Sequence, residues 1–150
     1  MKRILQLMVA TMILVGCVTG TFAGQKQDDA KALVKKAVAY LKEHGKEKAF
    51  AEFNNPRGRF VKGDLYIFVN DFSGVTLAHG SGNTKLIGKN MIALKDPDGK
   101  YFIKELANKA KEGGGWVEYK WTNPASKKIE PKMTYVEPFG DLAVGCGFYK

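Results

Sequence analysis

Cysteine and histidine are scarce in this sequence, which argues against metal chemistry. Only Cys17, Cys146, His44 and His79 occur, and no carboxylate cluster stands beside them at ligand spacing. A structural zinc site takes about four such ligands, so we expect neither a metal nor another cofactor. If the N-terminal segment that contains Cys17 is removed, Cys146 remains alone in an apolar run, and no disulfide can form within the domain.

Catalytic motifs are missing as well. A nucleophilic serine needs a neighbouring base and an orienting acid, whereas Ser73, Ser81 and Ser126 stand in turn-like stretches without such partners. The Gly80–Gly82 run is too short to cradle a phosphate, and no helix start follows it. We therefore expect no enzymatic activity.

The chain also lacks clusters of one charge, although it is basic overall. Its formal net charge is +9 at pH 7, and its sequence pI is about 9.5. The lysines occur in ones and twos with acids between them, and neither a helix-turn-helix pattern nor an RNA-binding signature accompanies them. We expect a solvated basic surface and no nucleic-acid partner.

The long apolar run of the sequence stands at its N-terminus. Ile4–Val18 follows two basic residues and precedes the small residues of Thr21–Ala23. This order predicts a secretory signal peptide, residues 1–23, cleaved after Ala23, because the run is short for a membrane span. An alternative is a bacterial lipobox that would leave Cys17 as a lipidated N-terminus. Either cut places the remaining domain, residues 24–150, in the periplasm or outside the cell.

Hydrophobic periodicity over the remaining residues predicts an α+β domain. Apolar residues at helical spacing predict a long helix from Asp28 to Gly45 and a shorter helical segment that ends before Pro56. A second amphipathic helix spans 102–110 and ends at three glycines. Runs of β-branched and aromatic residues predict strands at 65–69, 75–79, 116–121, 132–137 and 142–149. This order indicates a long N-terminal helix packed on an antiparallel sheet of about five strands.

The most informative stretch is the predicted β-hairpin at 116–137, with a loop of about eight residues. Strand alternation places Val117, Tyr119 and Trp121 on one face and Trp116 on the other. Large rings with polar tips are core in most proteins, but they also line small-molecule pockets. The sequence pattern leaves both readings open.

Five separated blocks resemble one family, the single Cache domain, in order and spacing. They are LYIFVNDFSGVTLAHG, LIGKNMIALKDPDGK, GGGWVEYKW, PKMTYV and VGCGFY. The family comprises PAS-like extracellular sensor modules of bacterial chemoreceptors and histidine kinases, and the resemblance covers residues 27–150. It implies a PAS-like fold that binds a small ligand, often a short carboxylate, on one side of the sheet. Because no second apolar span follows, we expect the stand-alone secreted form.

The resemblance also implies roles for two polar residues. His79 matches the family's Ala-His segment at the pocket rim, and Lys132 matches its Pro-Lys pair, where a cation can hold a carboxylate. The residues alone equally allow a structural hydrogen bond for His79 and an edge-strand lysine that discourages aggregation. The expected ligand-binding set is Phe68, His79, Trp116, Tyr119, Trp121, Lys132 and Tyr135.

We therefore expect an extracytoplasmic sensor domain for a short organic acid that feeds chemotaxis or two-component signalling. Ordering of the loop at 80–83 on binding is the expected report of occupancy. The alternative is an interaction module that docks on a membrane chemoreceptor or histidine kinase and binds no free ligand. A homodimer through the N-terminal helix fits either reading.

Overall fold

The computed structural model describes residues 21–150, so most of the predicted signal peptide, including Cys17, lies outside the described residues. The helices and strands are α1 (Thr21–Phe53), β1 (Val61–Lys62), β2 (Leu65–Asp71), β3 (Thr76–His79), the one-turn 3-10 helix η1 (Thr84–Leu86), α2 (Phe102–Lys111), β4 (Gly115–Thr122), β5 (Ile129–Phe139) and β6 (Leu142–Tyr149). The expected PAS-like α+β class is confirmed. The short strand β1 brings the sheet to six strands instead of about five.

The sheet is antiparallel, and its main path runs β1-β2-β6-β5-β4, with β3 also paired to β2. The C-terminal strand β6 therefore lies between β2 and β5, which explains why all of its residues are buried. The predicted hairpin is β4 with β5, but its loop, Asn123–Lys128, has six residues and not eight. It is shorter because the strand pairing extends to Thr122 and Ile129, beyond the predicted strand ends at 121 and 132.

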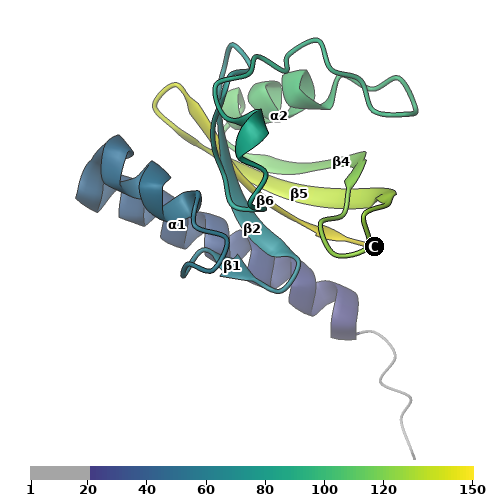
Figure 1. The fold of residues 1–150 in the computed structure, drawn as a ribbon, viewed down its shortest axis with the longest axis horizontal. Coiled ribbons are helices and arrows are strands. Elements are labelled where there is room, and N and C mark those ends of the chain that lie inside the picture. The colour runs from purple at the N-terminus through teal and green to yellow at the C-terminus, as the bar shows by residue number, and fades with distance from the viewer. Residues whose placement is uncertain (1–20) are drawn as a thin grey trace, which may run out of the picture.

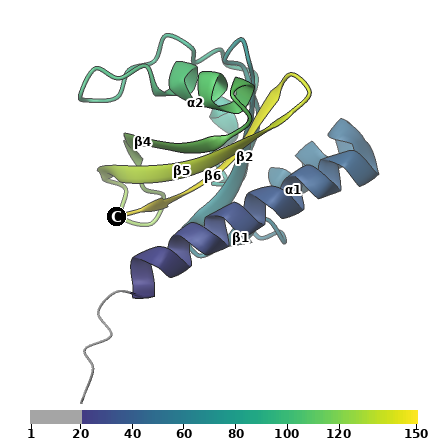
Figure 2. The same ribbon diagram turned by 180° about the vertical axis from the view of Figure 1, so that it is seen from behind.

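Helix α1 covers one face of this sheet (Figure 1), and the view from behind shows it running across the strands (Figure 2). Its buried residues recur at helical spacing and pack on β2, β5 and β6; they are Ala30, Leu33, Val34, Ala37, Leu41, Ala49 and Phe53. The helix bends at Gly45, where φ is +78°, so the two predicted helical segments form one bent helix. It begins at Thr21, before the predicted start. None of the helices within residues 21–150 is long and apolar enough to cross a membrane.

Helix α2 packs on the opposite face. Phe102, Ile103 and Leu106 contact Val117 and Tyr119 of β4 in a second apolar cluster. The Asp96 carboxylate fixes the approach to this helix, because it accepts backbone hydrogen bonds from Asp98, Lys100 and Lys120 at 3.0–3.1 Å. Burial alone would raise the pKa of Asp96, but these backbone N–H groups outweigh it and the pKa is lowered. The sheet thus has one face filled by α1 and another that α2 shares with loops.

Candidate functional site

A small cavity lies on the α2 side of the sheet, between α2, the strands and the loop that carries Leu86 and Met91. It is lined by Phe68, Asn70, Thr76, His79, Leu86, Met91, Phe102, Ile103, Leu106, Tyr119, Trp121 and Lys132. Its volume is about 20 Å³. A buried water molecule needs roughly 10–15 Å³ of such space, so the cavity in this conformation has room for about one water.

Strand pairing and the missing side chain of Gly147 allow the Lys132 side chain to reach this cavity. Lys132 lies on β5 directly opposite Tyr119 of β4, and its side chain passes over Gly147 of the neighbouring strand β6. A Cβ atom at Gly147 would collide with Thr134 Oγ1 and would lie 2.8 Å from Lys132 Cε. Gly145 leaves the same kind of room for the ring of Phe68. Positions 145 and 147 of β6 therefore require glycine, because the side chains of Phe68 and Lys132 occupy the space that a Cβ atom would fill.

Lys132 is a buried cation without a counter-charge. Only 1% of the residue is exposed, and no ion pair within residues 21–150 includes it. Its Nζ donates a hydrogen bond of 2.8 Å to Tyr66 Oη and lies 4.1 Å from the centroid of the Tyr66 ring and 5.0 Å from that of Tyr149. Burial lowers the pKa of Lys132 from 10.5 to about 7, and Cys146 and Asp64 oppose this shift only in part.

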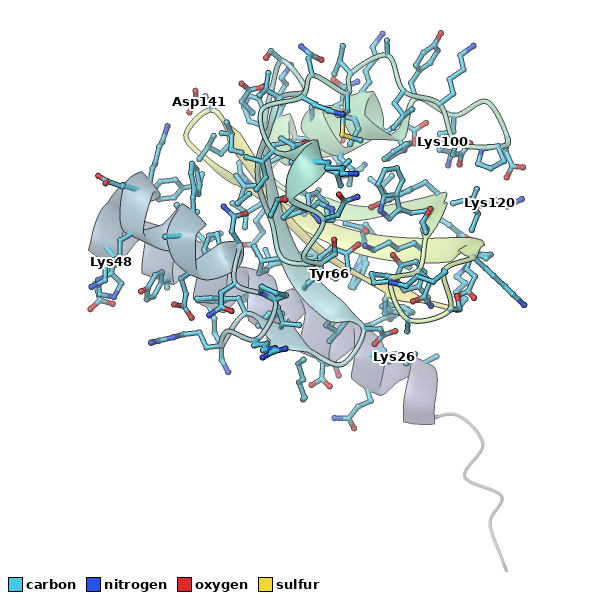
Figure 3. All side chains as sticks on the ribbon, viewed as in Figure 1. Lys26, Lys48, Tyr66, Lys100, Lys120 and Asp141 are labelled. Carbon is cyan, nitrogen blue, oxygen red and sulfur yellow. The ribbon has the colours of Figure 1, made fainter. Side chains whose placement is uncertain are left out.

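Two tyrosines extend the polar group around Lys132. Tyr149 Oη donates to the Thr122 carbonyl at 2.9 Å, so at the 3.3 Å contact between the two phenols Tyr66 is the donor. Burial raises the pKa of Tyr66 well above 10 and that of Tyr149 to about 12, which keeps both phenols neutral. Figure 3 shows Tyr66 in the middle of the molecule, in contrast to Lys48 and Asp141 at its periphery.

His79 forms a hydrogen bond with the loop after β3 and also lines the cavity. Its backbone N–H donates to Asn54 Oδ1 at 2.8 Å, and its Nδ1 lies 2.8 Å from Ser81 Oγ, which is the structural hydrogen bond considered from the sequence. The ring also lines the cavity and is 8% exposed as a residue. Burial, and then the charge of Lys132, lower the pKa of His79 to about 3. The imidazole is therefore neutral, and Lys132 is the cation of the cavity.

The structure brings together five of the seven residues expected at the site. Phe68, His79, Tyr119, Trp121 and Lys132 all line the cavity.

The other two, Trp116 and Tyr135, face α1 instead. Their rings pack against each other at 5.1 Å between centroids, and Tyr135 Oη donates to Glu137 Oε1 at 2.8 Å. Each lies an odd number of residues from a cavity residue on the same strand, so the pleat turns it to the opposite face. We therefore leave Trp116 and Tyr135 out of the candidate site.

Sequence reasoning missed Tyr66 and Tyr149, which hold Lys132. Tyr66 precedes Phe68 by two residues and so shares its face, a signal that alternation on β2 offers. The approach of Tyr149 depends on the position of β6 between β2 and β5. The same topology rules out the edge-strand reading of Lys132, because β5 pairs with β4 on one side and β6 on the other.

Comparison with known proteins agrees with this geometry. The model of the single Cache domain 2 family matches residues 22–150. The chain belongs to this family. The single Cache domain matches the sensor histidine kinase MctS of Rhizobium johnstonii at 38% identity over 88 residues, which is 57% of this chain and 19% of that protein. It matches the chemotaxis protein McpP of Pseudomonas putida at 30% identity over 90 residues, 57% of this chain and 16% of that protein. The chain thus spans less than a fifth of these relatives.

Solved structures show the same fold. A methyl-accepting chemotaxis protein of Vibrio parahaemolyticus superposes with a TM-score of 0.74 at 26% identity, covering 85% of this single Cache domain and 90% of that chain. A Cache chemosensory domain described for its carboxylic acid recognition superposes with a TM-score of 0.73 at 26% identity, covering 85% and 95% of the two chains.

Proposed function

We propose that this single Cache domain binds a short monocarboxylate in the cavity on the α2 side of the sheet. The observation that carries the proposal is the buried ammonium of Lys132, which lines the cavity and has no carboxylate partner among the described residues. The likeness to a domain described for carboxylic acid recognition supports the ligand class.

A carboxylate ligand would supply the charge that Lys132 lacks. Its oxygens would accept hydrogen bonds from Lys132 Nζ, and the neutral phenol of Tyr66 stands beside that amine at 2.8 Å. The apolar wall of Phe68, Leu106 and Trp121 would enclose a short hydrocarbon tail. Because the cavity has room for only about one water, a ligand of two or three carbons requires its wall to move outward, and the small volume favours short acids.

The setting of the domain is part of the proposal. Relatives in a histidine kinase and a chemotaxis protein support a role in signal transduction outside the cytoplasm, with residues 1–23 as a signal peptide. We propose that the domain acts through such a membrane receptor or kinase and pairs with itself through α1. The alternative, an interaction module that binds no free ligand, is less favoured. Such a module does not need a cavity that contains a buried cation.

A thermal-unfolding screen tests this function. The protein purified after expression of the full chain is heated with acetate, propionate, butyrate, pyruvate, amino acids or purines. A ligand at a roughly hundredfold excess over its Kd stabilises the fold by about 2.7 kcal/mol, and we expect this shift with short monocarboxylates. The variant Lys132→Met should lose the shift, whereas Lys48→Met, on the exposed far end of α1, should keep it.

The lysine variant should still fold, because methionine has a similar length and removes a buried charge that costs free energy to desolvate. A panel without any shift contradicts the proposal. So does a Lys132→Met variant that is stabilised by the same acids as the wild type.

A further inference from the structure

A second hollow adjoins the cavity and is much larger. Its volume is about 490 Å³, and residues of the loop after β3 and of the β4–β5 hairpin line it, among them Ser81, Asn83, Thr122 and Lys127. Leu86 and Trp121 line both this outer hollow and the cavity that contains Lys132, here called the inner cavity. These two side chains therefore stand between the two spaces.

The two side chains that form this partition, Leu86 and Trp121, belong to differently anchored parts of the fold. Trp121 belongs to β4, where it pairs with Glu130 and packs on Phe102 with 5.3 Å between ring centroids. Leu86 ends the one-turn helix η1, none of whose residues is buried. Its backbone N–H donates to Asn83 O at 3.3 Å, and its carbonyl accepts from Lys89 N at 3.1 Å. One side is thus fixed in the sheet and the other in a short turn at the surface.

The chemistry of the two spaces also differs. Lys132 places a cation in the inner cavity, whereas the outer hollow offers hydroxyl and amide groups and the side chain of Lys127. A carboxylate held at Lys132 would leave its tail to follow the remaining wall. A tail longer than the inner cavity then meets Leu86 and Trp121 before it reaches the outer hollow.

We propose that Leu86 and Trp121 determine ligand length by closing the inner cavity against the outer hollow. This inference rests on the proposed carboxylate binding and adds its selectivity. Removal of either side chain joins the two spaces, so that the carboxylate stays at Lys132 and a longer tail extends into the outer hollow. Short acids gain nothing from the outer hollow, because their tails contact Trp121 but end before they would pass between Leu86 and Trp121.

Calorimetric titration with acetate, butyrate and hexanoate tests the partition in the wild type, Leu86→Ala and Trp121→Ala. We expect both variants to raise the affinity for hexanoate relative to acetate by about tenfold, the low end of what one methylene is worth in an apolar pocket, because the outer hollow that receives the tail is partly polar. The matched control is Leu94→Ala, an exposed leucine that lines neither space and should leave the ratio unchanged.

An unchanged ratio in Leu86→Ala, or an equal change in Leu94→Ala, overturns the inference. Leu86→Ala carries the test if Trp121→Ala fails to fold, because Leu86 is only half-buried. If the wild type binds none of the acids, the proposed function fails, and the crystal structure of Leu86→Ala then decides the partition alone. One continuous space in that crystal supports the closure of the inner cavity by Leu86, and two separate spaces overturn it.

Discussion

At the scale of single residues, the central feature is the charge of Lys132. Moving an ammonium group out of water costs several kcal/mol after relaxation. One hydrogen bond to Tyr66 and the faces of the Tyr66 and Tyr149 rings compensate for part of this, with cation–π contacts worth about 0.5–2 kcal/mol each. The lowered pKa of Lys132, about 7, reflects the part of the desolvation cost that remains uncompensated. An anion bound in the cavity would compensate for this remainder.

This pKa predicts how affinity for a carboxylate depends on pH. Lys132 must be protonated to bind the anion, and in the free protein it loses its proton as the pH rises through about 7. We therefore expect nearly constant affinity for propionate between about pH 6 and 6.5, where the acid is fully ionised, and a fall approaching about tenfold per pH unit above 7. His79, with a pKa of about 3, and the neutral tyrosines do not titrate in this range.

Calorimetry in two buffers of different ionisation enthalpy checks the origin of that dependence. Uptake of protons should be near zero at pH 6 and approach one per propionate at pH 8, because binding raises the pKa of Lys132. An affinity that stays level from pH 6 to pH 8, without proton uptake, would show that the anion does not bind beside Lys132.

At the scale of the elements, strand β6 makes room for the site because two of its residues have no side chain. Gly145 and Gly147 point to the cavity side, where the side chains of Phe68 and Lys132 need the space of a missing Cβ. Their neighbours Val144, Cys146 and Phe148 face α1 and fill the larger apolar core. The α1 face of β6 is therefore packed by its own side chains, whereas at Gly145 and Gly147 the other face is packed by side chains of adjacent strands.

The variant Gly147→Ala should show this division. Its methyl group would overlap Thr134 Oγ1 and crowd Lys132, so we expect a loss of about 1–3 kcal/mol in the free energy of unfolding, as for other overpacked sites. Binding of propionate should weaken in parallel. Urea unfolding and titration measure the two effects.

The variant Val144→Ala of the same strand is the control. It removes part of a buried apolar side chain on the α1 side and should lower stability while leaving propionate affinity unchanged. Wild-type stability and affinity in Gly147→Ala would mean that the crossing of Lys132 over β6 is not as tight as described.

The elements themselves were predictable where local patterns decide. Alternation correctly placed Val117, Tyr119 and Trp121 on one face of β4, and three glycines correctly ended α2. The same alternation already placed Trp116 on the other face, although the expected set includes it; applied consistently to Trp116 and Tyr135, it removes both from the site. The contact of Lys132 with Tyr66 was not predictable in this way, because it joins residues 66 positions apart through the placement of β6 between them in the sheet.

At the scale of the whole molecule, the two faces of the sheet have different roles. Helix α1 covers one face (Figure 2), and a continuous apolar core fills the space between this helix and the sheet. On the other face α2 packs on β4, β5 and β6, and the segment that carries Leu86 and Met91 covers the remainder next to β2 and β3. The cavity forms where helix gives way to loop, so a ligand can enter there without disturbing the core that holds α1.

A crystal structure of the protein grown with propionate tests carboxylate binding most directly. We predict ligand density in the inner cavity on the α2 side, with a carboxylate oxygen about 2.7–2.9 Å from Lys132 Nζ and the tail against Phe68 and Trp121. An empty inner cavity at saturating propionate, or propionate bound on the α1 side near Trp116 and Tyr135, would contradict it.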